Sequence, residues 1–115
     1  MHELKIIQDI FPVIEKVAGD NHLKSITKVI LGVGEQRQVK NEFLQFAFDT
    51  LAKNSVAEGA ELVINLIPVT VLCNSCQKKF EICDNIYVCP GCGGIDLDVL
   101  TGKEIVLESV DGDRE

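Results

Sequence analysis

The chain has 115 residues, enough for one ordinary domain or two very small ones, with a hydrophobic fraction of 46% and a formal net charge of −7. The negative charge argues against binding to nucleic acid or to an anionic membrane surface, because both require clustered Lys and Arg. No apolar run approaches the ~20 residues of a membrane-spanning helix and no secretory signal is visible, so we expect a cytoplasmic protein.

The first expected element is an amphipathic helix between residues 4 and 21. Pro12 lies within it and lacks the N–H that would bond to the Gln8 carbonyl, so we expect a kink or a break, at a cost of ~3 kcal/mol. Gly19 and Asn21 are suited to the C-terminal end of the helix. Its apolar stripe is predicted to consist of Ile7, Ile10, Phe11, Ile14, Val17 and Ala18.

A strand over residues 25–33 and a second helix over residues 41–55 are expected next. Asn41 is the predicted N-cap of this helix. Alternation in the strand is expected to place Thr27, Val29, Leu31 and Val33 on one face. The buried stripe of the helix is predicted to consist of Phe43, Leu44, Ala47, Phe48 and Leu51.

Two further strands are expected over residues 60–67, where Pro68 ends the strand, and over residues 103–110. Together with the strand at 25–33 they predict one three-stranded sheet with two helices packed on it. The fold class is therefore α+β, with an α/β domain formed by residues 1–68 and 101–115. Residues 69–100 would be an inserted zinc-ribbon-like β module. Leu62, Ile64 and Leu66 are expected to share one face, as are Ile105 and Leu107.

Four of the five cysteines form two C-x-x-C pairs, Cys73–Cys76 and Cys89–Cys92, which flank twelve residues. Two such turns aim four sulfurs at one tetrahedral zinc ion, about 2.3 Å from each. The alternative, a pair of redox-active dithiols, lacks the βαβ context that such motifs need. Four thiolates leave no coordination position for a water, so we expect structural zinc whose binding drives the folding of this short module.

The remaining residues of the cysteine module are expected to have supporting roles. Cys83 is interpreted as a small buried apolar residue and not as a ligand. Gly93 and Gly94 suit the positive φ values of the second turn, whereas Gln77 takes the equivalent place in the first turn less comfortably.

The N-terminus offers a second set of metal donors. Deprotonated backbone amides bind Ni(II) or Cu(II), and both metals favour square-planar nitrogen sites. The amide nitrogen and Nδ1 of His2 close a six-membered ring around a metal. The next nitrogen in the plane is either the Met1 amine or the Glu3 amide, and we favour the Glu3 amide. His22 lies in a polar turn and is expected to be a solvated surface residue.

Motifs along nearly the whole chain resemble the HypA/HybF family of hydrogenase maturation nickel metallochaperones. They are, in order, "MHEL", "GVGE", "FLQFAFDTL", "EGAEL", the two C-x-x-C pairs and "GKEIVLESV". The resemblance implies a nickel-binding α/β domain and a zinc domain. It matches the family's nickel-binding start to Met1, His2 and Glu3, with His2 as ligand, and its zinc cysteines to Cys73, Cys76, Cys89 and Cys92.

The resemblance also implies a function and partners. Such proteins deliver nickel for the assembly of [NiFe] hydrogenase, and in some bacteria of urease, together with a nickel-handling maturation GTPase. The expected partners are that GTPase, the hydrogenase large subunit and urease maturation proteins, and the expected state is a monomer or weak homodimer. Some members of the family take a further nickel ligand from the region after the "GE" loop or from a histidine of the zinc domain. Here that region offers Lys40 and the zinc module has no histidine, so the fourth nickel ligand is open, and a backbone amide or water could serve.

Two other classes of function compete with this interpretation. A zinc-ribbon nucleic-acid or transcription accessory protein is the alternative, but Lys78 and Lys79 are balanced by Glu81 and Asp84. Four thiolates on one Zn²⁺ add about −2 to that segment and disfavour phosphate contact. Enzymatic activity is the least supported of these functions, because the sequence shows no nucleophile–base pair, phosphate-binding loop or open metal site.

Overall fold

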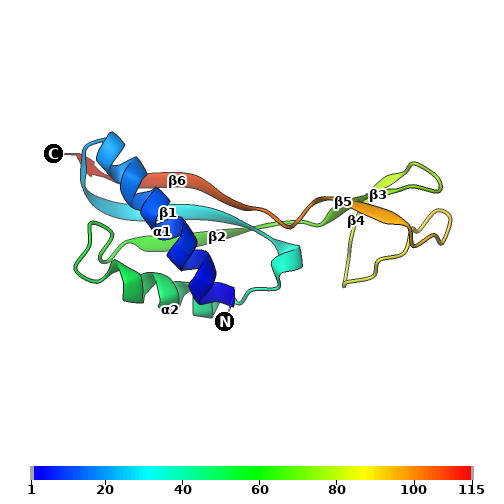
Figure 1. Ribbon diagram of the computed structural model, residues 1–115, viewed down its shortest axis with the longest axis horizontal. Coiled ribbons are helices and arrows are strands. Elements are labelled where there is room, and N and C mark those ends of the chain that lie inside the picture. The colour runs from blue at the N-terminus through cyan, green and yellow to red at the C-terminus, as the bar shows by residue number, and fades with distance from the viewer. Residues whose placement is uncertain (1, 115) are drawn as a thin grey trace. The chain divides into compact units, whose positions relative to one another are not determined.

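The structure of the protein is a computed structural model that describes residues 2–114, with His2 described by its backbone alone. Two three-stranded sheets, of strand order β2-β1-β6 and β4-β3-β5, confirm the expected α+β class. Figure 1 shows β3, β4 and β5 between β2 and β6 in the chain, which is the predicted insertion. The elements are α1 His2–Asp20, β1 Leu23–Gly34, the 3₁₀ helix η1 Glu35–Arg37, α2 Asn41–Ala52, β2 Glu61–Ile67, β3 Thr70–Cys73, β4 Lys79–Glu81, β5 Leu97–Thr101 and β6 Ile105–Arg114.

The chain divides into two compact units. The first, the helical unit, combines the N-terminal segment up to Gly32 with Val39–Asn65 and the C-terminal segment from Val106. The second, the cysteine unit, combines Val33–Gln38 with Leu66–Ile105. No helix within the described part of the chain is both long enough and apolar enough to span a membrane.

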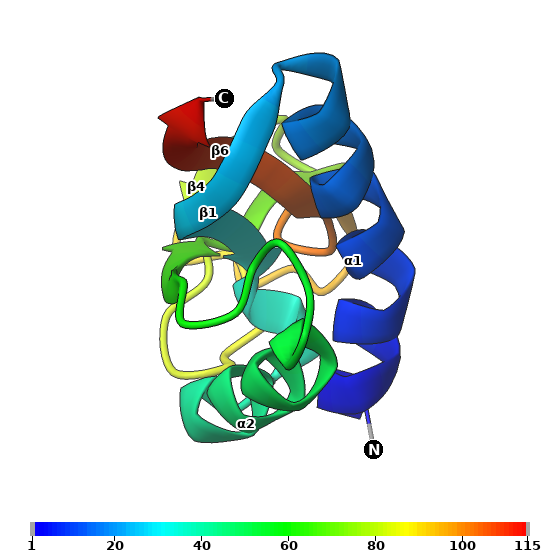
Figure 2. The same ribbon diagram turned by 90° about the vertical axis from the view of Figure 1, so that its left-hand side faces the viewer.

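The core of the helical unit lies between its two helices and its sheet, as Figure 2 shows. The rings of Phe11 on α1 and Phe48 on α2 lie 6.0 Å apart at 59°, a tilted arrangement that aromatic pairs favour. The apolar stripes predicted from helical periodicity supply most of this core. Its fully buried side chains include Ile7, Ile14, Val29, Leu31, Leu44 and Phe48.

Helix α1 has no break at Pro12, and it differs from expectation at its end. Both Pro12 and Gln8 are exposed, so water can bond to the carbonyl that Pro12 leaves unpaired. The left-handed residue after the helix is His22, with φ 58°, and not Asn21. His22 is exposed, as predicted.

The start of α2 is displaced by one residue from the prediction. The N-cap is Lys40, which makes no side-chain capping bond, and Asn41 is already helical. Phe43 is 41% exposed instead of buried, whereas Ala52 is buried. The buried stripe therefore lies further along the helix than predicted. It has four buried residues instead of the five predicted: Leu44, Ala47, Phe48 and Ala52.

The strands also depart from simple alternation in two places. Thr27 is exposed and Ile26 is buried, so alternation is interrupted before Val29. The Ile26 N–H donates to the Val56 carbonyl at 2.8 Å, so the loop before β2 contacts β1 at this residue. Leu66 is 59% exposed and does not share the buried position of Leu62; it already belongs to the cysteine unit. Strand β2 ends at Ile67, directly before Pro68, as expected.

The cysteine unit has a small core around the central strand β3. Val71 pairs with Phe80 of β4 and with Val99 of β5. Val69, Val71 and Ile82 are its buried cluster. Four partly buried side chains, Phe80, Tyr87, Leu97 and Val99, pack against this cluster. A core of this size is small for a segment of this length, so we expect the unit to need another source of folding free energy.

The end of β1 packs closely on the turn before β6. The Gly34 N–H donates to the Glu104 carbonyl at 2.8 Å, and the Gln36 N–H donates to the Gly102 carbonyl at 2.9 Å. A Cβ on Gly34 would lie 2.0 Å from the Gly102 oxygen and 2.6 Å from the Lys103 nitrogen. Both atoms belong to the backbone, so only glycine fits without displacing the chain.

Gly34→Ala is therefore expected to lower the free energy of unfolding by about 1–3 kcal/mol, the range for overpacked positions. Gly19→Ala is the matched control, since a Cβ there meets nothing within 4 Å and alanine favours a helix by about 0.5–1 kcal/mol. Urea denaturation of the two variants measures both effects. Equal stability of Gly34→Ala and the unaltered protein would contradict the close approach.

Candidate metal centre

Four cysteine sulfurs from two chain segments converge in the cysteine unit. The Sγ atoms of Cys73, Cys76, Cys89 and Cys92 all lie within 4.8 Å of one another. The Cys73–Cys92 and Cys76–Cys89 Sγ pairs are each 3.6 Å apart. Sulfur ligands about 2.3 Å from a tetrahedral ion lie about 3.8 Å from each other. The donor set and its spacing therefore fit one four-coordinate metal ion.

The same backbone pattern holds each C-x-x-C pair. In the first turn the Cys73 N–H donates to the Lys78 carbonyl at 2.9 Å, and the Gln77 N–H donates to the Cys73 carbonyl at 2.7 Å. The second turn repeats both bonds at the same sequence spacing around Cys89. The two turns are thus equivalent, and each presents two sulfurs on one side.

Backbone strain in these turns follows the sequence prediction in part. Gln77, with φ 62°, and Gly93, with φ 73°, both take the left-handed conformation at equivalent places. Gly94 does not; it is required for another reason, since a Cβ there would lie 3.2 Å from the Cys92 Sγ. The glycine next to the cluster therefore leaves room for sulfur.

Backbone N–H groups stabilise the first thiolate of each pair. The Cys76 N–H is the main cause of the lowered pKa of Cys73, and the Cys92 N–H acts likewise on Cys89, whose pKa falls to about 6. The Lys78 N–H lowers the pKa of Cys76, but neighbouring thiols and burial outweigh it and raise that pKa to about 12. The pKa of Cys92 is raised despite a similar backbone bond. A dication among the sulfurs would favour ionisation of all four thiols.

Cys83 lies outside this cluster, as predicted, but its surroundings differ from the prediction. It is exposed and not buried. The reason is local: Asp84 and Asn85 directly after it both adopt positive φ, so the chain turns at the surface there. Cys83 follows Ile82, whose side chain takes the buried place instead.

The residues of the second predicted site stand at the start of α1. Met1 and the side chain of His2 lie outside the described residues. The backbone of His2 is the first residue of α1, and Glu3 lies in its first turn. Glu3 is 8% exposed, and its Oε2 accepts a hydrogen bond from the Lys40 N–H at 3.1 Å. The sequence did not indicate this contact, because it joins residues 37 positions apart.

A mostly apolar cavity of about 230 Å³ borders Glu3. It lies in the helical unit between the first turn of α1 and one side of α2, and it borders Glu3 of the predicted nickel-binding residues. The residues that line it are Glu3, Leu4, Phe43, Phe46, Ala47 and Thr50. Glu3 therefore borders mostly apolar side chains on this side.

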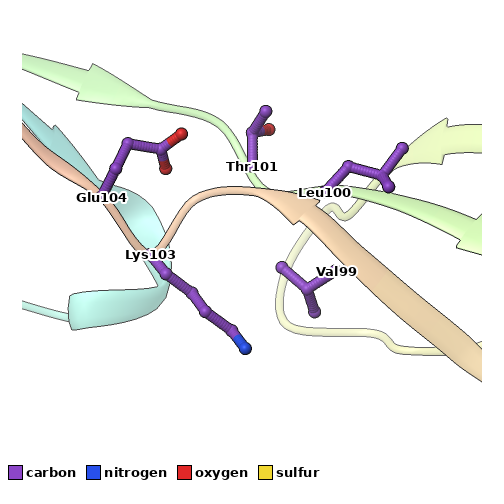
Figure 3. Close-up of a pocket in the computed structure, with 5 residues that line it drawn as sticks. All are labelled: Val99, Leu100, Thr101, Lys103 and Glu104. Atoms are coloured by element: carbon purple, nitrogen blue, oxygen red, sulfur yellow. The ribbon is translucent and has the colours of Figure 1, made fainter.

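A pocket of about 220 Å³ in the cysteine unit does not form a site. Figure 3 shows the side chains of Lys103 and Glu104 on its border pointing away from each other. The Glu104 carboxylate accepts a hydrogen bond from the Gly102 N–H. Its pKa is lowered by its own backbone N–H first and then by that of Gly102. No charged groups converge on a ligand in this pocket.

Comparisons with known proteins agree with the resemblance. The profile of the family described as "Hydrogenase/urease nickel incorporation, metallochaperone, hypA" matches residues 1–112. The hydrogenase maturation factor HypA of Aquifex aeolicus is 34% identical over 111 residues, which cover 96% of each chain. That of Desulfitobacterium hafniense is 35% identical over 111 residues, covering 96% of this chain and 97% of the relative.

Solved structures show the same fold. The solution structure of a HypA protein superposes with a TM-score of 0.73 at 27% identity, covering 100% of this chain and 98% of the other. The Ni metallochaperone HypA of Helicobacter pylori superposes with a TM-score of 0.70, covering 98% of each chain, and at 23% identity this likeness concerns the fold alone. With the family profile and the relatives in agreement over nearly its full length, the chain belongs to the HypA family of hydrogenase/urease nickel incorporation metallochaperones.

Proposed function

We propose that the chain binds Ni(II) at its N-terminus and delivers it during the maturation of [NiFe] hydrogenase, and of urease where that enzyme is the client. The observation that carries the proposal is the family match over residues 1–112. The four-cysteine cluster supports it, because the implied zinc domain has its complete donor set.

The proposed nickel donors are the nitrogens of the first residues. The Nδ1 and amide nitrogen of His2 bind the metal together with either the Glu3 amide or the Met1 amine. Placement of His2 and Glu3 in the first turn of α1 supports the use of amides, because the first N–H groups of a helix have no intrahelical acceptor. Such an amide can lose its proton to a metal without breaking the helix.

The proposed resident metal is Zn²⁺ held by Cys73, Cys76, Cys89 and Cys92. Four thiolates close its coordination shell, so the zinc stabilises the fold and activates no water. Residues 69–100 then act as the zinc-binding domain, and residues 1–68 with 101–115 act as the nickel-binding domain. A division of metals between domains lets the cargo leave while the resident metal stays.

The proposed partners follow from delivery of a metal cargo. A nickel-handling maturation GTPase, the hydrogenase large subunit and urease maturation proteins would receive or pass on the nickel in the cytoplasm. The chain itself would act as a monomer or weak homodimer and catalyse no reaction. Release of the cargo then depends on a partner offering better nickel ligands.

A nickel titration tests this function. Zinc-loaded protein free of nickel is titrated with Ni(II) by calorimetry, and zinc is counted separately before and after. We expect one nickel per chain, loss of this binding in His2→Ala, and one zinc per chain in both proteins. Nickel that binds only by displacing zinc would contradict an N-terminal site.

Nucleic-acid binding is the competing function of a zinc-ribbon protein, and we expect none. The net charge of −7 and the thiolate-bound zinc both oppose contact with phosphates. The zinc-loaded protein should therefore show no retention on immobilised DNA or RNA at 50 mM salt. Retention that falls as salt is raised would favour the accessory-protein function instead.

A further inference from the structure

We infer that the Glu3 carboxylate positions the backbone of the proposed nickel site and is not itself a nickel ligand. It does so by joining the first turn of α1 to the start of α2. This inference rests on the proposed binding of nickel by the N-terminal nitrogens. It assigns to Glu3 two separate roles, in which the amide faces the metal and the carboxylate holds the backbone.

The burial of Glu3 shows that the carboxylate has a structural task. Among the side chains that the structure describes, Glu3 is the only charged one that is buried. Charged groups are almost never buried unless they are paired or hydrogen-bonded. The Lys40 N–H donates to Oε2 of Glu3 at 3.1 Å, a charge-assisted bond in the mostly apolar surroundings of Leu4 and Phe43.

Two helix ends meet at this carboxylate. Glu3 lies in the first turn of α1, and Lys40 is the N-cap of α2. Helix N-termini carry partial positive charge, so a carboxylate between two of them is stabilised by both. Lys40 makes no side-chain capping bond of its own. Glu3, which belongs to α1, therefore provides a hydrogen-bond acceptor for the backbone at the start of α2.

This bond constrains the backbone that would bind nickel. The Glu3 side chain is anchored through Lys40 to a helix whose side chains Leu44 and Phe48 are fully buried. The amide nitrogen of Glu3 is therefore held by a packed core, although it lies near the chain terminus, where backbone is otherwise loosely ordered. A chelate whose backbone is ordered beforehand loses less conformational entropy when the metal binds.

Variants that keep the Glu3 amide separate the two roles of this residue. In Glu3→Ala the acceptor is lost, and nickel affinity should fall about tenfold, as expected when roughly one residue must be ordered on binding. In Glu3→Gln the side-chain oxygen can still accept the Lys40 bond, so affinity should stay within about threefold of the original. The visible absorption band of square-planar nickel should be identical in all three proteins.

The donor side of the bond gives an independent test. Lys40→Pro removes the N–H, whereas its control Lys40→Ala keeps the N–H and removes only the side chain. We expect Lys40→Pro to weaken nickel binding in the same direction as Glu3→Ala, and to weaken it more than Lys40→Ala, which removes only the side chain that lies over the Phe43 ring. The double variant Glu3→Ala/Lys40→Pro should bind no more weakly than Glu3→Ala alone, since Glu3→Ala already removes the contact that Lys40→Pro breaks.

The outcomes distinguish the inference from the proposed function. Equal weakening in Glu3→Gln and Glu3→Ala, with a changed absorption band, would show that the carboxylate binds nickel and would overturn the inference. Unchanged affinity in Glu3→Ala would overturn it as well. If His2→Ala retains the full nickel affinity, the proposed N-terminal site itself fails. Circular dichroism of each variant verifies that α1 and α2 are intact.

Discussion

Cys73→Ser is expected to abolish zinc binding and to unfold the segment from residue 69 to residue 100 while the helical unit stays folded. Cys73 is fully buried, and its backbone closes the first turn through Lys78 and Gln77. A structural zinc site contributes roughly 10–16 kcal/mol in zinc-finger peptides, far more than the buried cluster around Val71 can supply. Loss of one of the four zinc ligands therefore removes the main source of stability of the cysteine unit.

The helical unit should survive because its core is separate. Phe11, Phe48 and the buried residues Ile26, Val29 and Leu31 of β1 lie within that unit, which contains no cysteine. Zinc content measured by mass spectrometry should fall from one to zero per chain, while the helical circular dichroism signal remains. Loss of the helical signal in step with zinc would contradict the independence of the two units.

Cys83→Ser is the matched control for this experiment. Cys83 lies in the same unit but is exposed and outside the cluster of four sulfurs. This variant should keep one zinc per chain, with four sulfur ligands in X-ray absorption. Three sulfur ligands would show that Cys83 replaces one of the four assigned cysteines.

The fold was predictable from the sequence where a single local pattern determines burial. Helical periodicity identified Ile7, Ile14 and Phe48 as core residues, and all three are fully buried. The local pattern fails where another segment intervenes. The predicted alternation of β1 is interrupted at Ile26, the residue that the loop before β2 contacts through the Val56 carbonyl. Capping preference predicted Asn41 as the N-cap of α2, one residue after the actual N-cap, Lys40.

The two metal sites differ in how much of them a sequence reveals. The cysteine cluster was predictable from spacing, because each C-x-x-C turn is a local structure. The pairing of β3 with β4 and with β5 brings the two turns together. The contact between Glu3 and Lys40 has no local signature. It depends on the packing of α1 against α2, which only the tertiary structure shows.

His2→Ala is expected to weaken nickel binding by at least about a hundredfold, which corresponds to about 2.7 kcal/mol. The variant loses the imidazole and with it the six-membered chelate ring that the His2 amide and Nδ1 close around the metal. Zinc content should not change, because the four cysteines form the other site. Calorimetry with Ni(II) and zinc analysis of the same sample measure both quantities.

An N-terminally extended form of the protein decides which nitrogen completes the chelate. The His2 amide has two neighbouring positions in the square plane; Nδ1 takes one, and either the Met1 amine or the Glu3 amide takes the other. We expect the extension to weaken binding only modestly, because it leaves the Glu3 amide in place and α1 holds that amide in its first turn. A loss as large as that of His2→Ala would instead assign the position to the Met1 amine. A chelate that uses the Glu3 amide is preorganised by the start of the helix. A chelate that uses the Met1 amine forms only when the chain terminus becomes ordered.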